Sequence, residues 1–130
     1  MSEETYACYL LLGDDLDPDT VSEYLGLTPT RAWRKGDASP DSGPQDVGGW
    51  LLGSDLPRDC SEEDHVLALF QALRPSWLAA ASLGARYRAS LYVVVRTSSH
   101  ANPVFNFDRS TVRQAAELNA ELGVDLYLVQ

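Results

Sequence analysis

The segment from residue 85 to residue 97 constrains the fold more than any other feature of this chain, because its residues alternate in character. Small or apolar residues occupy one set of alternate positions: Ala85, Tyr87, Ala89, Leu91, Val93 and Val95. The other set is more polar: Arg86, Arg88, Ser90, Tyr92, Val94 and Arg96. A period of two is typical of a β-strand. We therefore expect a long strand with one face against the core.

Two helices are predicted from their end signals. Asp17 followed by Pro18 is typical of a helix start, because the carboxylate accepts a free backbone N–H group and proline lacks one. Gly26 ends this short helix, since glycine tolerates the left-handed conformation. A second helix is expected over 61–84, beginning with a serine capping box and interrupted by Pro75. Ser76 and Gly84 would then cap and close its last part.

A third helix is expected to begin at Asp108 or Ser110 and to end at Gly123. Strands are predicted at 5–12, 31–35, 50–54, 85–97, 104–107 and 124–130, the fifth after a turn that contains His100. The order is then β-α-β-β-α-β-β-α-β. It predicts an α+β fold, ferredoxin-like or related, with a mainly antiparallel sheet and helices packed on one face. No linker divides the chain, so residues 1–130 are expected to form a single domain.

The chain is acidic, and the charge is uneven. It has 19 Asp and Glu residues against 10 Lys and Arg residues, a formal net charge of −9. Residues 1–64 carry 15 acids and 4 bases, whereas residues 65–130 carry 4 acids and 6 bases. Such a charge favours encounter with a cationic partner and opposes binding to nucleic acid or anionic membranes. Neither a signal peptide nor an apolar run of membrane-spanning length is recognised, so a cytoplasmic location is expected.

A basic group interrupts the acidic half of the chain. Arg31, Arg34 and Lys35 are three of the four cations in residues 1–64, and they flank Trp33. They could hold an anion, with the indole as a stacking surface. Alternatively, these charges protect a sheet edge from pairing. If Arg86, Arg88 and Arg96 share a sheet face with this group, a cationic patch forms; if helices cover that face, the arginines need buried partners.

Motifs for metal binding and catalysis are incomplete. Asp15, Asp17 and Asp19 have the spacing of the first EF-hand ligands, but Gly26 stands where the bidentate glutamate belongs. Glu62 and His65 form a single Glu-x-x-His pair, whereas di-metal bundles need two; His65 is expected at the surface or at the boundary of the core. Cys8 is expected in the core, and Cys60 lies among acids that oppose thiolate formation. No metal, cofactor or catalytic residue is assigned.

Several features together resemble a known family. They are the opening strand, the segment GDDLDPD, the element Arg31-Ala-Trp-Arg-Lys-Gly-Asp37, a loop, and Trp50-Leu-Leu-Gly-Ser54. This combination resembles a bacterial family catalogued as domain of unknown function 4279, over nearly the whole chain. The resemblance implies a small stand-alone bacterial domain of α+β type, and it carries no agreed activity, cofactor or catalytic residue.

Two functions are expected from these observations. The first is a non-enzymatic protein-binding domain, of which an immunity protein that neutralises a basic toxin is one example. It would act through the loop from Asp37 to Trp50 and through acidic residues: Asp14, Asp15, Asp17, Asp19, Asp55, Asp59, Glu62 and Glu63. The alternative is a small-anion or small-ligand site, for binding alone or for catalysis, around Trp33, Arg34, Lys35 and Trp50. The candidate binding residues are Arg31, Trp33, Arg34, Lys35, Asp37, Trp50, Arg86 and Arg88. The protein is expected to be a monomer, or a homodimer joined through a sheet edge.

Overall fold

The computed structural model describes residues 4–39, 43–98 and 104–129, so His100 lies outside the described residues. The strands are β1 (Glu4–Gly13), β2 (Arg31–Trp33), β3 (Ala38–Ser39), β4 (Gly43–Pro44), β5 (Gly48–Gly53), β6 (Arg88–Ser98) and β7 (Ala120–Val129). The helices are α1 (Pro18–Leu25), α2 (Glu62–Leu73), the short 3-10 helix η1 (Arg74–Ser76), α3 (Trp77–Arg86) and α4 (Arg109–Glu117).

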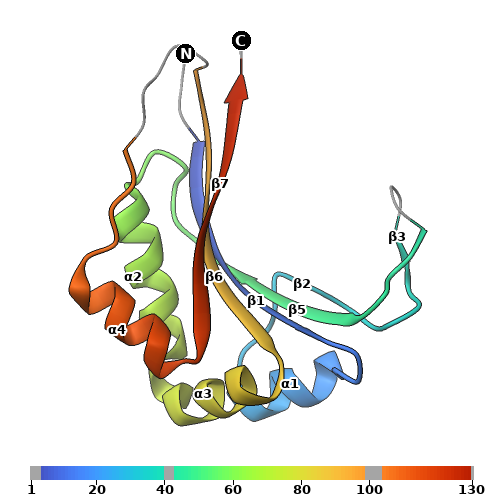
Figure 1. Ribbon diagram of the computed structural model, residues 1–130. Helices are drawn as coiled ribbons and strands as arrows, with labels where there is room; N and C mark the ends of the chain where they lie inside the picture. The colour runs from blue at the N-terminus through green and yellow to red at the C-terminus, as the bar shows by residue number, and fades with distance from the viewer. Residues whose placement is uncertain (1–3, 40–42, 99–103, 130) are drawn as a thin grey trace.

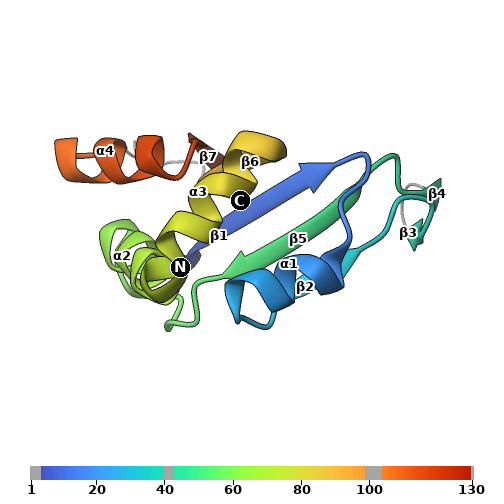
Figure 2. The ribbon, with the colours of Figure 1, turned by 90° about the horizontal axis from the view of Figure 1, so that it is seen from below.

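Five strands form one sheet in the order β2-β5-β1-β6-β7, and β3 and β4 form a separate small hairpin. β1 is antiparallel to both β5 and β6, and β2 is antiparallel to β5, whereas β6 and β7 are parallel. Helices and sheet form two layers (Figures 1 and 2). The expected α+β class, with a mainly antiparallel sheet and helices packed on one face, is confirmed.

The expected strand at 104–107 is wrong. This segment has no regular structure, although Phe105 and Phe107 pack against the core and Val104 is 75% exposed. The two phenylalanines thus anchor an irregular connection to the core. The chain continues from β6 through α4 into β7, which makes β7 parallel to β6 in place of the expected hairpin.

The third helix also ends earlier than expected. α4 stops at Glu117, and Asn119 then adopts a left-handed conformation with φ of 57°. Asparagine tolerates this conformation better than most residues, so it can end a helix where no glycine is present. Gly123, expected as the helix end, lies inside β7, which is consequently ten residues long.

Three predicted helix starts are confirmed. Asp17 accepts a hydrogen bond from the Asp19 amide at 3.1 Å, Ser61 from the Asp64 amide at 3.1 Å, and Asp108 from the Thr111 amide at 2.8 Å. The expected role of Ser76 is wrong, because its hydroxyl donates to the Leu25 carbonyl at 2.6 Å and does not cap α3.

The core lies between the helices and one face of the sheet. The alternation expected for 85–97 is confirmed from Arg88 onward, since Ala89, Leu91, Val93 and Val95 are buried under the helices. The expected start of the strand is wrong, because Ala85 and Arg86 belong to α3. The continuous helical run Glu62–Arg86 meets the length and composition criterion for a membrane span, contrary to the sequence-based expectation, but core helices meet the same criterion. In this structure the run changes direction at η1, between α2 and α3 (Figure 1).

Gly84 does not close the helix, as the sequence suggested, because α3 continues to Arg86. A Cβ atom at Gly84 would collide with the backbone oxygen of Leu118, and it would lie 3.0 Å from the Cβ atom of Asn119. Glycine at this position therefore lets α3 pack closely against the turn between α4 and β7.

Candidate functional site

The five-stranded sheet has one face that no described helix covers, and we call it the open face. Its residues alternate with the buried ones along each strand, as the strand registers require. The exposed or half-buried side chains on the open face are Tyr6, Leu10, Leu12, Arg31, Trp33, Leu51, Arg88, Ser90, Tyr92, Arg96, Glu121, Asp125 and Tyr127. Cys8 and Val94 belong to the same face but are buried. A protein that leaves a sheet face uncovered exposes a broad surface for contacts, and the open face is therefore the candidate site.

Arginines on this face are stacked on aromatic rings. The Arg31 guanidinium carbon lies 5.0 Å from the centre of the Trp33 ring, and that of Arg96 lies 5.9 Å from the Tyr127 ring. Arg58 reaches the open face from the loop after β5 and lies 4.1 Å from the centre of the Tyr6 ring. Each contact is a cation–π interaction that holds a long side chain in place.

The sequence left open whether the arginines of 86–96 share a face with Arg31. Arg88 and Arg96 do lie on the open face with Arg31, whereas Arg86 ends α3 and forms an ion pair with Asp15 at 3.1 Å. Arg58 was not among the predicted site residues. Nothing in the sequence indicates that Arg58, which precedes the acidic start of a helix, contacts the sheet.

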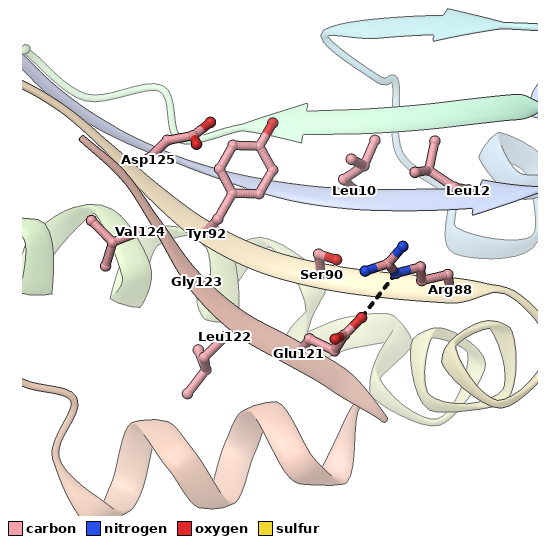
Figure 3. A pocket seen from close by; sticks show the side chains of 10 residues that line it. All are labelled: Leu10, Leu12, Arg88, Ser90, Tyr92, Glu121, Leu122, Gly123, Val124 and Asp125. Carbon is pink, nitrogen blue, oxygen red and sulfur yellow. Dashed lines mark hydrogen bonds and ion pairs between the residues drawn. The ribbon is translucent and has the colours of Figure 1, made fainter. Parts of the chain in front are cut away.

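A hollow of about 470 Å³ lies on the open face where β1, β6 and β7 meet. Figure 3 shows that Leu10 and Leu12 line it from β1, Arg88, Ser90 and Tyr92 from β6, and Glu121 and Asp125 from β7. Arg88 forms an ion pair with Glu121 at 3.0 Å, whereas Asp125 has no ion pair among the described residues. The hollow thus combines an apolar part with one unpaired carboxylate.

Two titratable groups at or next to the hollow, the Tyr92 hydroxyl and the Cys8 thiol, are protonated at neutral pH. Burial raises the pKa of the Tyr92 hydroxyl, and the neighbouring Cys8 raises it further. Burial also raises the pKa of the Cys8 thiol, which faces Tyr92 across β1 and β6. Neither group is therefore an activated nucleophile.

Two cations of the basic group near Trp33, Arg34 and Lys35, are neutralised by acids, whereas Arg31 stacks on Trp33. Arg34 forms ion pairs with Asp17 and Asp19, both at 2.8 Å, and Lys35 with Asp14 at 2.6 Å. Burial opposes ionisation of Asp17, but its hydrogen bonds and the charge of Arg34 together lower its pKa. The hydrogen bond and the negative charge of Asp14 raise the pKa of Lys35. These cations therefore already have anionic partners within the protein.

The two tryptophans of the predicted site lie on opposite faces of the sheet. Trp33 packs on Gly49 on the open face, and its indole N–H donates to the Val47 carbonyl at 3.0 Å. Trp50 is completely buried under the helices, where its indole N–H donates to the Ser22 hydroxyl at 2.9 Å. The structure therefore does not bring Trp33 and Trp50 together in one pocket.

Asp37 stabilises the turn after β2, because its carboxylate accepts a hydrogen bond from the Arg34 amide at 2.8 Å. Beyond it, the loop between the tryptophans contains the hairpin of β3 and β4, and residues 40–42 within it lie outside the described part of the chain. Asp37 thus has a local structural role.

The acidic residues fall into two groups that differ in their partners. In the first group, Asp14, Asp15, Asp17 and Asp19 pair with Arg34, Lys35 and Arg86, as given above. The second group, which we call the acidic loop group, consists of Asp55, Asp59, Glu62, Glu63 and Asp64. Within the described part of the chain, no member of the acidic loop group has an ion pair. The excess negative charge is therefore concentrated at the start of α2.

His65 is completely buried, not at the surface or boundary as the sequence suggested. Its Nδ1 lies 2.6 Å from the Ser54 hydroxyl and its Nε2 lies 3.1 Å from the Pro57 carbonyl oxygen. Since a carbonyl can only accept, Nε2 carries the proton and Ser54 donates to Nδ1. The Ser54 oxygen in turn accepts from the Ala7 amide at 2.9 Å. His65 therefore links α2 to β1.

No metal site is found in the described regions, where no three His, Cys, Asp or Glu side chains are grouped to hold an ion. The fold defines a small α+β domain, and its uncovered sheet face carries tyrosines, arginines and a hollow. The chain belongs to the family described as Domain of unknown function (DUF4279), whose model matches residues 3–129. The family suggested by the sequence is thus confirmed. Neither a curated protein nor a solved structure matches the chain significantly.

Proposed function

We propose that this protein is a non-enzymatic protein-binding domain and that the open face is its binding surface. The observation that carries the proposal is the concentration of tyrosine, tryptophan and arginine on a sheet face that no described helix covers. These residue types supply much of the binding free energy at protein interfaces. The stacking of Arg31 on Trp33 and of Arg58 on Tyr6 supports the proposal, because prearranged side chains lose less entropy on binding.

The proposal does not include catalysis. On the open face Ser90 lies opposite Glu121, but the carboxylate of Glu121 is held by Arg88 in an ion pair of 3.0 Å, and His65 lies in the core. Tyr92 and Cys8 keep their protons at neutral pH for the reason given above.

The proposed partner is basic. The net charge of −9 and the unpaired acidic loop group favour approach of a cationic protein, and long-range attraction increases the rate of association. Arg58 lies within the same loop and contacts Tyr6, so this loop reaches the open face, whereas Glu62 and Glu63 lie beside Phe107 on the helix side. A role similar to that of an immunity protein, which neutralises a basic toxin, is part of this proposal.

Affinity purification from the source cell tests the proposal, with variants on and off the open face. Arg31→Ala and Tyr127→Ala remove exposed side chains of the open face, at opposite edges of the sheet. Arg113→Ala and Tyr24→Ala are matched controls on the exposed side of the helices. We expect the wild type and both controls to recover the same basic protein, and both open-face variants to recover several-fold less. Recovery of no partner at moderate salt, or equal recovery by all variants, would contradict the proposal.

A second candidate function is a small-ligand site, and the hollow beside Tyr92 is the observation that favours it. Its volume of about 470 Å³ lies within the range typical of ligand pockets, roughly 300–1,000 Å³. The residues concerned differ from the predicted ones around Trp33 and Trp50. If this function is correct, at least one compound in a thermal-shift screen of phosphates, nucleotides and carboxylates would raise the melting temperature. A flat response across the panel would remove the candidate.

A further inference from the structure

β7 forms an edge of the sheet that is long and chemically unprotected. It contains ten residues, whereas β2 at the other edge contains three. Among the described residues, no strand pairs with the outer edge of β7. Edge strands usually carry lysine, proline or a bulge that prevents pairing with other chains. β7 has neither lysine nor proline, and its ten residues pair with successive residues of β6 without a bulge.

The two sides of β7 differ in chemistry. Its charged residues, Glu121 and Asp125, are both acids and both lie on the open face. On the helix side, Val124, Leu126 and Leu128 are 36%, 42% and 53% exposed. β7 extends past the end of α4 (Figure 1), which leaves this apolar row uncovered by that helix.

A second copy of the chain is a poor occupant of this edge. If two β7 strands paired in the antiparallel direction, the open faces would be continuous, and the acids of both copies would lie on the same side of the joined strands. Neighbouring like charges on paired strands are destabilising. Glu121 is neutralised by Arg88, but Asp125 has no ion pair in the described part of the chain and would face added negative charge.

The complementary occupant is a basic strand. We infer that the outer edge of β7 accepts an extended segment of the basic partner as a sixth strand, in which lysine or arginine alternates with apolar residues. The inference rests on the proposed function and specifies how the partner is held. Main-chain hydrogen bonds would supply affinity, and alternate side chains would supply specificity. The basic side chains would lie on the open face near Asp125, and the apolar ones beside Leu126 and Leu128.

Synthetic peptides test this inference on the full-length chain. The probe is a nine-residue peptide that alternates valine and lysine, titrated by NMR while amide exchange of β7 is followed. Two isomers of the peptide are matched controls: one is N-methylated on every valine, the other on every lysine. In an extended strand, alternate amides point to opposite edges, so in the more stable antiparallel direction, with its lysines on the open face, only one isomer can pair with β7. We expect one isomer to bind and to protect β7 amides, and the other to bind at least tenfold more weakly.

A charge variant adds a second readout. Asp125→Asn is expected to weaken binding of the unmethylated peptide about twofold to fivefold, the range for one cross-strand ion pair. Glu23→Gln makes the same change of charge on α1, where Glu23 is exposed, and it should leave the affinity unchanged. Equal affinity of the two isomers, without protection of β7 amides, would mean that attraction is only electrostatic, and it would overturn the inference. A dimer in light scattering, with β7 amides protected in the absence of peptide, would also overturn it.

Failure of this inference is distinguishable from failure of the proposed function. If neither isomer binds, but Arg31→Ala still reduces recovery of the partner, the open face remains the binding surface and the strand addition is wrong. If the isomers differ as expected, but no protein is recovered from the cell, strand addition stands and the proposed function fails.

Discussion

Tyr9 places a hydroxyl group in the core where, among the described residues, it has no hydrogen-bond partner. The ring is completely buried and meets Trp50 edge to face, with the ring centres 6.4 Å apart and the planes at 78°. A buried polar group without a partner costs roughly 1–3 kcal/mol. Tyr9→Phe removes that group and keeps the ring. We therefore predict that the substitution stabilises the protein, in contrast to most core substitutions.

The expected magnitude follows from two opposing contributions. Removal of the hydroxyl recovers about 1–3 kcal/mol, and loss of the oxygen's van der Waals contacts costs a few tenths of a kcal/mol, at about 0.1–0.2 kcal/mol per atom pair. The net gain in unfolding free energy is about 1–2 kcal/mol. For a chain of this size, each kcal/mol corresponds to about 3–5 °C in melting temperature.

Chemical unfolding in urea at pH 7, with the slope m compared between variants, is the appropriate assay. Tyr24→Phe is the matched control, since Tyr24 is 55% exposed and its hydroxyl is hydrated in either state; its free energy should change by less than about 0.5 kcal/mol. A loss of stability of more than about 1 kcal/mol for Tyr9→Phe, with m unchanged, would refute the reasoning, because it would show that the hydroxyl has a partner.

The same substitution has a pH dependence. Burial raises the pKa of Tyr9 above its ordinary value. The stability that depends on its proton is fully present below the unfolded pKa of about 10, and it is lost as the pH rises toward the folded pKa. The advantage of Tyr9→Phe over the wild type should therefore increase above about pH 10. A constant difference between pH 7 and the highest accessible pH would contradict this.

Three further predictions concern packing and capping. Gly84→Ala should destabilise the protein by about 1–3 kcal/mol despite the better helix propensity of alanine, because the backbone of Leu118 blocks the new methyl group; urea unfolding measures this, and a gain in stability would refute the close approach. His65→Ala should lower the free energy of unfolding by about 2–4 kcal/mol, since it opens a cavity and leaves the Ser54 hydroxyl without its acceptor. An effect below about 0.5 kcal/mol in the same assay would contradict a stabilising link between α2 and β1 through His65. Hydrogen bonds from the backbone and side chain of Thr111 lower the pKa of Asp108. The contribution of this carboxylate to stability is therefore present above the unfolded pKa of about 3.9, and it is lost as the pH falls through the folded value. Asp108→Asn should make the melting temperature less sensitive to pH in that range, and an unchanged dependence of the melting temperature on acid pH would argue against the cap.

The candidate site was predictable only in part. The alternation of 85–97 correctly placed Arg88 and Tyr92 opposite the buried residues, because the period of a strand depends on local geometry alone. The sequence could not show that Arg34 and Lys35 pair with Asp14 to Asp19, since these contacts join segments about 15 to 21 positions apart. Nor could it show that Arg58 reaches the sheet. A site that depends on which segments meet is decided by the fold.

What the sequence determined by itself was local. The caps at Asp17, Ser61 and Asp108 form as predicted, because each depends on a side chain and amides two or three residues away. The tertiary structure alone decided that 104–107 is an irregular connection, in which the phenylalanines pack against the core and do not pair as a strand. It also decided the parallel direction of β7 and the edge that this strand leaves free. Burial of apolar surface is non-directional, so the same residues satisfy it in several arrangements, and only the complete set of long-range contacts selects one.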